Sequence, residues 1–230
     1  FEKISVEQYE TQTPIDVNLG NLQSEQITGM LAQASQNVPQ EFNRVTNQLG
    51  VGKYGFSAEQ LEGAGYLKPG VTEFFLKDGV ADLETVLQST SVWSGKNGVS
   101  NLTGVLSDEP LQDFIKTDLY TTGFNQLRAE GIITGSETAD SIAALIEPAS
   151  QFGAQSVKQW INNTAPDETT TAQINQLARS AQYSVQLADQ KISNALKGFN
   201  TGASSTNTVA RGTVDSESRT VVTETQGYSA

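Results

Sequence analysis

The sequence predicts a mainly α-helical fold with extended segments at both ends. Between residues 24 and 196, apolar residues recur at three- and four-residue spacing, which is the period of helices with one buried face. Glycine and asparagine separate these stretches, as expected for helices joined by short loops. At the two ends the apolar period is two residues, or large apolar residues are few.

The first 23 residues are predicted to form an extended N-terminal arm. From residue 1 to residue 20, apolar residues fall at two-residue spacing on either side of Pro14, which is typical of extended chain. The period becomes helical at Ser24, which is expected to cap the first helix. A second short helix is expected over Phe42–Leu49, with its end at Gly50.

Residues 24–163 are predicted to form a helical body. Its clearest local signal is the capping-box spacing of Ser57 and Gln60, followed by Gly65 where a helix often ends in the left-handed conformation. Four further helices are predicted from apolar residues at helical spacing: Leu83, Val86 and Leu87; Leu111, Phe114, Ile115 and Leu119; Tyr120, Phe124 and Leu127; and Ile142, Leu145, Ile146 and Ala149.

Residues 164–198 are predicted to contain one long amphipathic helix. An apolar stripe continues from Ile174 to Leu196 and stops before Gly198, so this helix can pack on the core or on a partner helix. Residues 199–230 are rich in Ser and Thr and are predicted to form an extended or disordered C-terminal arm. Within this arm, four residues could order in extended form: Val209, Val214, Val221 and Val222.

The composition argues against several classes of function. A net charge of -12, from 26 acidic and 14 basic residues, repels nucleic acid and acidic membranes. No stretch approaches the roughly 18 apolar residues of a spanning helix. The chain has no histidine or cysteine, which excludes Ser-His and Cys-His nucleophiles and thiolate zinc sites. Since no calcium-loop pattern occurs either, we expect no cofactor and no bound metal.

Two further features bear on processing and on phosphate binding. The chain begins at Phe1 with polar sequence, so we expect no signal peptide and a segment or processed product of a longer protein. The glycine-rich stretch Gly50–Gly55 lacks the Lys-Ser or Lys-Thr of a phosphate-binding loop and is interpreted as a connection between helices. Without histidine or cysteine, paired carboxylates for glycoside cleavage are the main hydrolytic chemistry left.

Several segments together resemble one family of modules. Leu49–Phe56, followed by Gly65 and Tyr66, resembles the GKYQ and GY segment of lysozyme-like or lytic-transglycosylase-like modules, and Val92–Val99 resembles their WTGKDGV segment. Modules of this kind occur in bacteriophage and bacterial surface proteins. Further matching positions follow at the expected distances, over roughly residues 30 to 160: Gln60, Leu61, Lys68, Pro110, Leu111, Gln112, Phe124, Leu127, Gly131 and Ile132.

The resemblance implies a lysozyme-like helical body and also shows where the chain departs from active members. Their general acid is a Glu that ends the helix before the GKYQ segment, whereas this chain has Ala34 or Gln36 there. Neither side chain can donate a proton. The Gln that follows the Tyr is replaced by Gly55. Glu41 is the nearest carboxylate and a weak candidate acid, for which we favour an ordinary role in the first turn of the next helix.

The remaining motif residues are interpreted as structural. Their aromatic side chains bring large apolar areas and are expected in the core: Tyr54, Phe56, Tyr66 and Trp93. Three glycines are expected to hold backbone geometry rather than a ligand: Gly52, Gly95 and Gly98.

These observations lead to one favoured function and two alternatives. The whole arrangement, with its long helix and valine-containing tail, resembles structural proteins of contractile-tailed phages, which implies a tail or baseplate component of the virion. The favoured hypothesis is a catalytically inactive lysozyme-like module used as an assembly scaffold, with residues 1–20 and 200–230 contacting other virion proteins. The alternatives are an active peptidoglycan hydrolase that uses Glu41, and a non-catalytic module that binds cell-wall carbohydrate.

Overall fold

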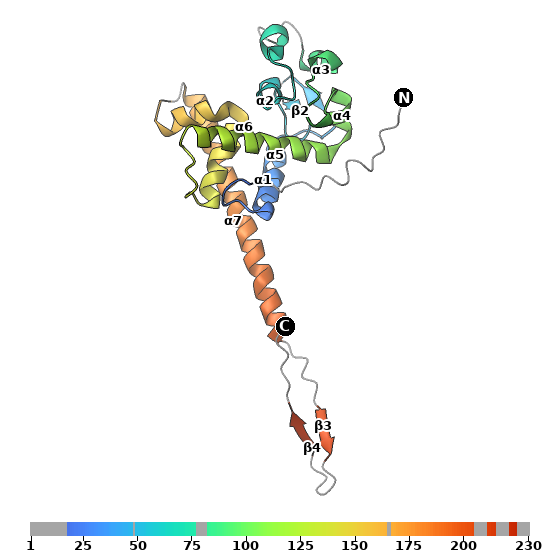
Figure 1. The fold of residues 1–230 in the computed structure, drawn as a ribbon, viewed down its shortest axis with the longest axis vertical. Coiled ribbons are helices and arrows are strands. Elements are labelled where there is room, and N and C mark those ends of the chain that lie inside the picture. Colours follow the sequence, from blue (N-terminus) through green and yellow to red (C-terminus); the bar gives the residue numbers. More distant parts are fainter. Residues whose placement is uncertain are drawn as a thin grey trace. The chain divides into compact units, whose positions relative to one another are not determined.

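A computed structural model describes residues 18–47, 49–76, 82–164, 167–204, 211–214 and 221–224, and these are mainly helical (Figure 1). The predicted mainly α fold class is therefore confirmed. Residues 1–17 of the predicted N-terminal arm lie outside the described residues, as does Val209 of the C-terminal arm. The chain divides into two compact units, one up to Ala188 and one from Asp189.

The first described helix, α1 (Ser24–Gln36), begins one residue earlier than the predicted cap implies. Gln23 is the N-cap residue, and its backbone N–H donates to Oε1 of Gln26 over 2.8 Å, so the prediction of Ser24 as the cap is wrong. Glutamine at both positions can perform the reciprocal bonding that the sequence preference assigns to Ser or Thr. Leu19, just before α1, is fully buried.

The described residues of Phe42–Leu49, all but residue 48, form no helix, contrary to the sequence prediction. The segment contains β1 (Val45–Thr46), which pairs antiparallel with β2 (Gly50–Val51). Within the turn between them, the hydroxyl of Thr46 accepts a hydrogen bond from the backbone N–H of Leu49 over 2.9 Å. Such local side-chain bonds compete with helix formation, which explains why the apolar spacing was misleading here.

The next part of the body holds short helices. Figure 1 shows α2 (Ala58–Gly63), α3 (Leu83–Gln88) and α4 (Leu102–Ser107) near the small sheet. The predicted capping box of α2 is confirmed, because Ser57 Oγ accepts from the N–H of Gln60 and Gln60 Oε1 accepts from the N–H of Ser57. Single turns lie between these helices: η2 (Thr72–Leu76), η4 (Thr90–Val92) and η5 (Lys96–Gly98).

Two long helices form the centre of the body. α5 (Glu109–Ala129) is one continuous helix where the sequence predicted two, and its Gly123 packs closely on α6 (Ala139–Ile161). A Cβ at Gly123 would lie 3.1 Å from the Cβ of Ala149. α6 continues past its predicted end but breaks at Gly153, where φ is +80°.

The last helix, α7 (Glu168–Ser204), begins and ends beyond the predicted stripe from Ile174 to Leu196. Its stripe is buried from Ile174 to Ala188, and Gly29 of α1 packs against it, with a Cβ there 3.2 Å from the carbonyl oxygen of Ser184. Beyond α7, β3 (Arg211–Val214) pairs antiparallel with β4 (Val221–Glu224), so Val214, Val221 and Val222 adopt the extended form suggested by the sequence.

Candidate functional site

The Gly-Lys-Tyr segment forms a tight, largely buried turn. Val51 and Phe56 exchange backbone hydrogen bonds of 3.0 and 2.9 Å, and the chain reverses between them with φ near +67° at Gly52 and +61° at Gly55. Residues with a side chain rarely adopt these φ values, so Gly52 holds backbone geometry, as predicted, and Gly55 has the same role. The side chain of Tyr54 is buried within this turn.

Gln112 of α5 joins this turn to the body. Its Oε1 accepts from the backbone N–H of Lys53 over 2.9 Å, and its Nε2 donates to the carbonyls of Phe42 and Val105 over 2.7 and 2.9 Å. The residue is fully buried, and Gln40 provides a second amide bridge to the carbonyls of the turn. The Pro-Leu-Gln element of the resemblance therefore acts as an anchor for the turn.

Two carboxylates of α5 face the side chains of Lys53 and Tyr54. Lys53 Nζ lies 3.0 Å from Oε1 of Glu109 and 2.7 Å from Oδ1 of Asp113, and the Tyr54 hydroxyl donates to Oδ1 of Asp113 over 2.5 Å. Burial lowers the pKa of Lys53, but the hydrogen bonds and charges of these carboxylates outweigh it and the pKa is raised. Burial, and then Asp113, raise the pKa of Tyr54 well above its usual value.

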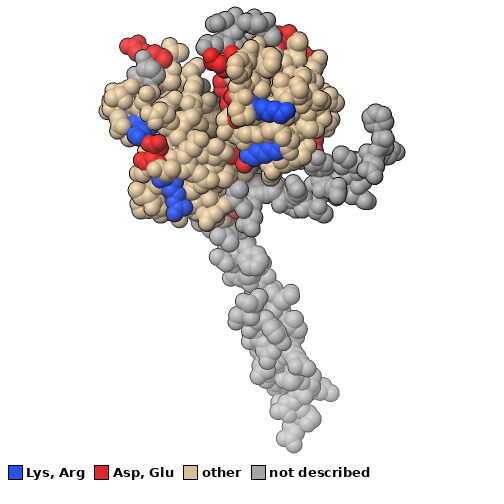
Figure 2. Space-filling model, turned by 45° about the horizontal axis from the view of Figure 1, so that its top comes forward, with Lys and Arg blue, Asp and Glu red and all other residues tan. Residues whose placement is uncertain are grey.

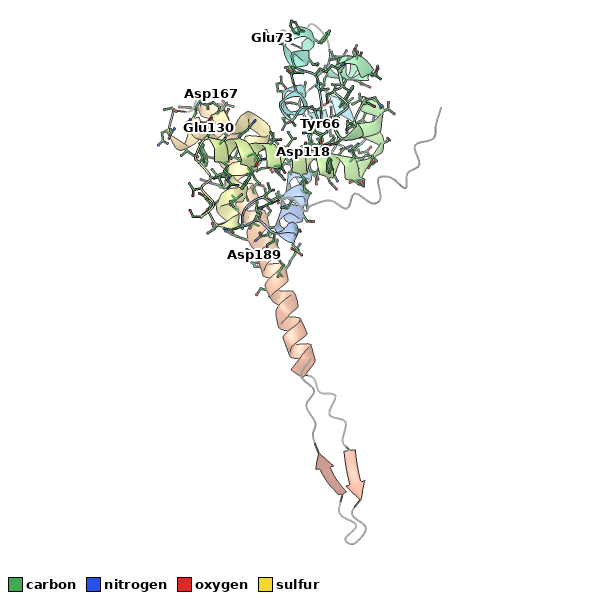
Figure 3. All side chains as sticks on the ribbon, in the orientation of Figure 1. Tyr66, Glu73, Asp118, Glu130, Asp167 and Asp189 are labelled. Atoms are coloured by element: carbon green, nitrogen blue, oxygen red, sulfur yellow. The ribbon has the colours of Figure 1, made fainter. Side chains whose placement is uncertain are left out.

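The two segments that carry the family resemblance are in contact. Ser94 N donates to the carbonyl of Tyr66 over 2.9 Å, and Lys96 Nζ bonds the carbonyl of Ala64 and Oδ2 of Asp118, each over 2.6 Å. Figure 3 shows Tyr66 and Asp118 side by side, and burial raises the pKa of the Tyr66 phenol. The buried aromatics of this region agree with the prediction of a structural role: Tyr54, Phe56, Tyr66 and Trp93.

The sequence-predicted acid, Glu41, lies at the protein surface. Its side chain is 73% exposed, and its nearest cation is Arg44, with 3.8 Å between Oε2 and Nε. Glu41 sits in a turn and not in the first turn of a helix, so the helix-start role that we favoured for it is wrong. At the positions where active members of the family would carry the acid, Ala34 is buried and Gln36 is exposed.

A buried ion pair connects α5 to α6. Lys116 Nζ donates to Oε1 of Glu147 over 3.0 Å and to Oγ of Ser150 over 2.9 Å, while the Tyr120 hydroxyl donates to Oε2 of Glu147. The side chains of Lys116 and Glu147 are only 1% and 5% exposed. Burial and the Glu147 charge raise the pKa of Tyr120. Charged groups that are buried away from water need a partner for each polar atom. Lys116, Glu147, Ser150 and Tyr120 provide these partners for one another.

A cleft of about 230 Å³ adjoins this network at Ser150. It is lined by α2, α5 and α6, and Gln60 and Ser150 belong both to its wall and to the network. The Nε2 of Gln60 donates to the carbonyl of Ser150 over 2.8 Å, three residues before the break of α6 at Gly153. Gln60 and Ser150 thus both make hydrogen bonds within the protein.

The contacts of Asp113 and Glu147 neutralise charge and hold the backbone in place. They are less suited to proton transfer. Both oxygens of Glu147 accept hydrogen bonds inside the core, and Oδ1 of Asp113 accepts from Lys53 and Tyr54. A general acid must instead present a proton to a bound substrate. Among the described side chains, no group of three or more acidic residues is arranged to hold a metal ion.

The surface adds two observations. On the face drawn in Figure 2, Lys and Arg side chains stand apart from one another and form no basic patch. Within the described ranges, no helix is both long enough and apolar enough to cross a membrane.

No family model, curated protein or solved structure matches the chain. The family resemblance therefore rests on the motif residues themselves.

Sequence reasoning missed the residues that make most of the polar contacts. Asp113, Lys116 and Glu147 were absent from the candidate residues, although Lys116 and Glu147 each interrupt an apolar helical face. A charged residue on a face otherwise destined for the core is a signal of a buried pair. Which residue pairs with which depends on how α5 and α6 pack, and the sequence does not give that.

Proposed function

We propose that the chain is a structural component of a phage virion, in its tail or baseplate, with a lysozyme-like helical body that serves as an assembly scaffold without catalysis. One observation carries the proposal. The carboxylates around the Gly-Lys-Tyr turn, Glu109 and Asp113, are engaged with Lys53 and Tyr54, and the position of the family's acid holds Ala34 or Gln36. The ion pairs and hydrogen bonds of Glu109 and Asp113 therefore stabilise the helical body.

The polar contacts inside the helical body support a scaffold role. Its polar interior is fixed by the Lys116 and Glu147 pair and by the Gln112 amide, which join elements distant in sequence. Networks of this kind specify one arrangement of the core when every member is satisfied. A subunit that keeps its shape while its ends contact neighbours is what an assembly requires, although the partners themselves follow only from the resemblance.

The cleft favours a second candidate, a module that binds cell-wall carbohydrate without cleaving it. Its wall combines apolar surface from Leu119 and Phe152 with polar side chains from Thr122 and Gln126. Ligand sites commonly combine these two kinds of surface. The volume of about 230 Å³ is slightly below the usual range for small-molecule sites, which favours a small ligand unit such as a single sugar ring.

A cell-wall turbidity assay tests the proposal. The full chain should not clear a suspension of peptidoglycan-containing walls that an active lysozyme clears, and neither should Glu41→Gln or Asp113→Asn. Clearing by the unaltered chain that Glu41→Gln abolishes would establish the hydrolase alternative. Clearing that only Asp113→Asn abolishes would instead identify a catalytic carboxylate beside Tyr54. Either result would overturn the scaffold proposal.

Binding without clearing would support the second candidate. Sedimentation with insoluble peptidoglycan should leave the full chain in the supernatant if the scaffold proposal holds. Saturable co-sedimentation that Thr122→Phe abolishes by filling the cleft, with Glu41→Gln as the unaffected control, would establish carbohydrate binding.

A further inference from the structure

The loop of residues 94–99 contains the single Asn-Gly pair of the chain, Asn97 and Gly98. An asparagine before a glycine readily loses its side-chain amide, because glycine has no side chain to shield its backbone nitrogen. That nitrogen attacks Cγ of the asparagine, the Nδ2 group leaves as ammonia, and a five-membered imide forms. Water then opens the imide to aspartate or isoaspartate. Asn97 is exposed, so water can reach it.

The backbone conformation of Asn97 opposes this reaction. The imide ring closes only when the Gly98 nitrogen lies on the same side of the Cα–C bond as the Asn97 side chain. The observed ψ of 28° at Asn97 instead turns this nitrogen away from the side chain. The φ of 53° places Asn97 in the left-handed region, which asparagine adopts more readily than most residues. The reaction therefore requires a large rotation of the peptide between residues 97 and 98.

Hydrogen bonds hold the two reacting groups in this conformation. The backbone N–H of Gly98 donates to the carbonyl of Gly95 over 3.1 Å, and Nδ2 of Asn97 donates to the hydroxyl of Tyr66 over 3.2 Å. Tyr66 is fully buried, so its hydroxyl is a fixed point for the Asn97 amide. Imide formation removes the hydrogen of the Gly98 nitrogen and the Nδ2 group of Asn97, so both hydrogen bonds are lost on the way.

Further contacts hold the loop on either side of Asn97. Ser94 Oγ accepts from the N–H of Lys96 over 3.1 Å and donates to the carbonyl of Gly65 over 2.6 Å. After Asn97, the N–H of Val99 donates to the carbonyl of Lys96 over 2.9 Å, and the Val99 side chain is buried. Because both ends of this short loop are held, the peptide after Asn97 can rotate only when the loop opens.

We propose that Asn97 is the deamidation site of this chain, and that the fold permits the reaction only when the loop of residues 94–99 opens. Native proteins open locally in this way without unfolding as a whole. The reaction is irreversible, so the converted copies are those in which the loop has opened. Isoaspartate also lengthens the backbone between Lys96 and Val99, so a converted loop cannot return to its original geometry. The proposal does not rest on the scaffold function.

Peptide mapping by mass spectrometry tests the site. The full chain is incubated in mildly alkaline buffer, with and without concentrated urea, and conversion is followed by the mass increase from amide to acid. In urea, Asn97 should convert before any other asparagine. In the native protein its conversion should be slower by about tenfold or more, since only opened loops react. Asn97→Gln should remove the signal, because its imide ring is larger and closes much more slowly.

Two variants test whether loop opening controls the native rate. Ser94→Ala removes hydrogen bonds that hold the loop, and Tyr66→Phe removes the acceptor of the Asn97 amide. Each should speed native conversion by about threefold or more, which corresponds to the loss of one ordinary hydrogen bond, and should leave the rate in urea unchanged. Ser107→Ala, which changes an exposed serine of α4, is the matched control and should change neither rate.

Several outcomes would overturn the proposal. Preferential conversion of another asparagine in urea excludes Asn97 as the site, and equal rates in native protein and urea exclude control by the fold. Native rates that neither Ser94→Ala nor Tyr66→Phe changes exclude control by this loop. Gly52→Ala should weaken the whole fold from outside the loop, so native conversion that this variant accelerates proceeds through global unfolding and not through the loop. None of these results bears on the turbidity assay.

Discussion

Gly52 and Gln112 can occupy their positions only because residue 52 has no side chain. A Cβ on Gly52 would lie 2.1 Å from Oε1 of Gln112, the atom that accepts the hydrogen bond of the Lys53 backbone N–H. The backbone of Gly52 also has φ of +67°, which favours glycine by itself. The attachment of the Gly-Lys-Tyr turn to α5 therefore needs glycine at position 52 for two reasons, the space beside Gln112 and the positive φ.

Gly52→Ala should destabilise the protein. The left-handed conformation costs an alanine about 1–2 kcal/mol, and displacement of the Gln112 amide adds to it. We expect a loss of roughly 2–4 kcal/mol in the free energy of unfolding, measured by chemical denaturation. Gly63→Ala is the matched control, because a Cβ there meets nothing within 4 Å and α2 tolerates alanine. Equal losses in the two variants would contradict the anchor role.

Lys116→Met should be among the most destabilising substitutions in α5, because it leaves the Glu147 carboxylate buried without its cation. Breaking a buried pair in this way costs about 3–5 kcal/mol. The double variant Lys116→Met/Glu147→Gln removes both charges, and the amide oxygen that replaces the carboxylate can still accept from Tyr120. Its loss should be smaller than the sum of the two single losses by about 1 kcal/mol or more. Additive losses in denaturation experiments would show that the two residues do not interact.

Three tyrosines should resist ionisation in the folded protein. Burial raises the pKa of Tyr54, Tyr66 and Tyr120, so their phenols stay protonated at pH values where exposed tyrosines ionise. The stability that they contribute is fully present below pH 10 and is lost as the pH rises above it. An ultraviolet titration should show that these three ionise only when the chain unfolds. Asp113→Asn should lower the ionisation midpoint of Tyr54.

Glu137 should contribute to acid sensitivity. Hydrogen bonds from the backbone and side chain of Thr134, with a further one from the Gly135 N–H, lower the pKa of Glu137 to about 2. A lowered pKa stabilises the folded state above the unfolded pKa, and this contribution disappears as the pH falls from about 4.5 toward 2. Glu137→Gln should therefore reduce the drop in Tm between pH 6 and pH 2.5. An unchanged drop in the Glu137→Gln variant would contradict this role of Glu137.

Local signals in the sequence predicted the helices whose ends are set by nearby residues. The capping box of Ser57 and Gln60 required no information from elsewhere, because both hydrogen bonds form within one turn. The apolar spacing gave a wrong prediction over Phe42–Leu49. There the side-chain amide of Gln112 donates to the carbonyl of Phe42, and the amide of Gln40 donates to carbonyls in the turn that follows, in place of the backbone hydrogen bonds of a helix. Gln112 lies 70 residues from Phe42, so no window of sequence contains that bond.

Composition and periodicity thus determined the mainly helical class, the burial of the aromatic residues in the motifs, and the role of Gly52 in holding the backbone. Each of these depends on a residue's own size, polarity or backbone freedom. Packing decided the rest. The pairing of Lys116 with Glu147, the contact of Tyr54 with Asp113 and the exposure of Glu41 arise only when α5, α6 and the turn are brought together. Electrostatic and hydrogen-bonding energies depend on distance and burial in space, and sequence separation fixes neither of them.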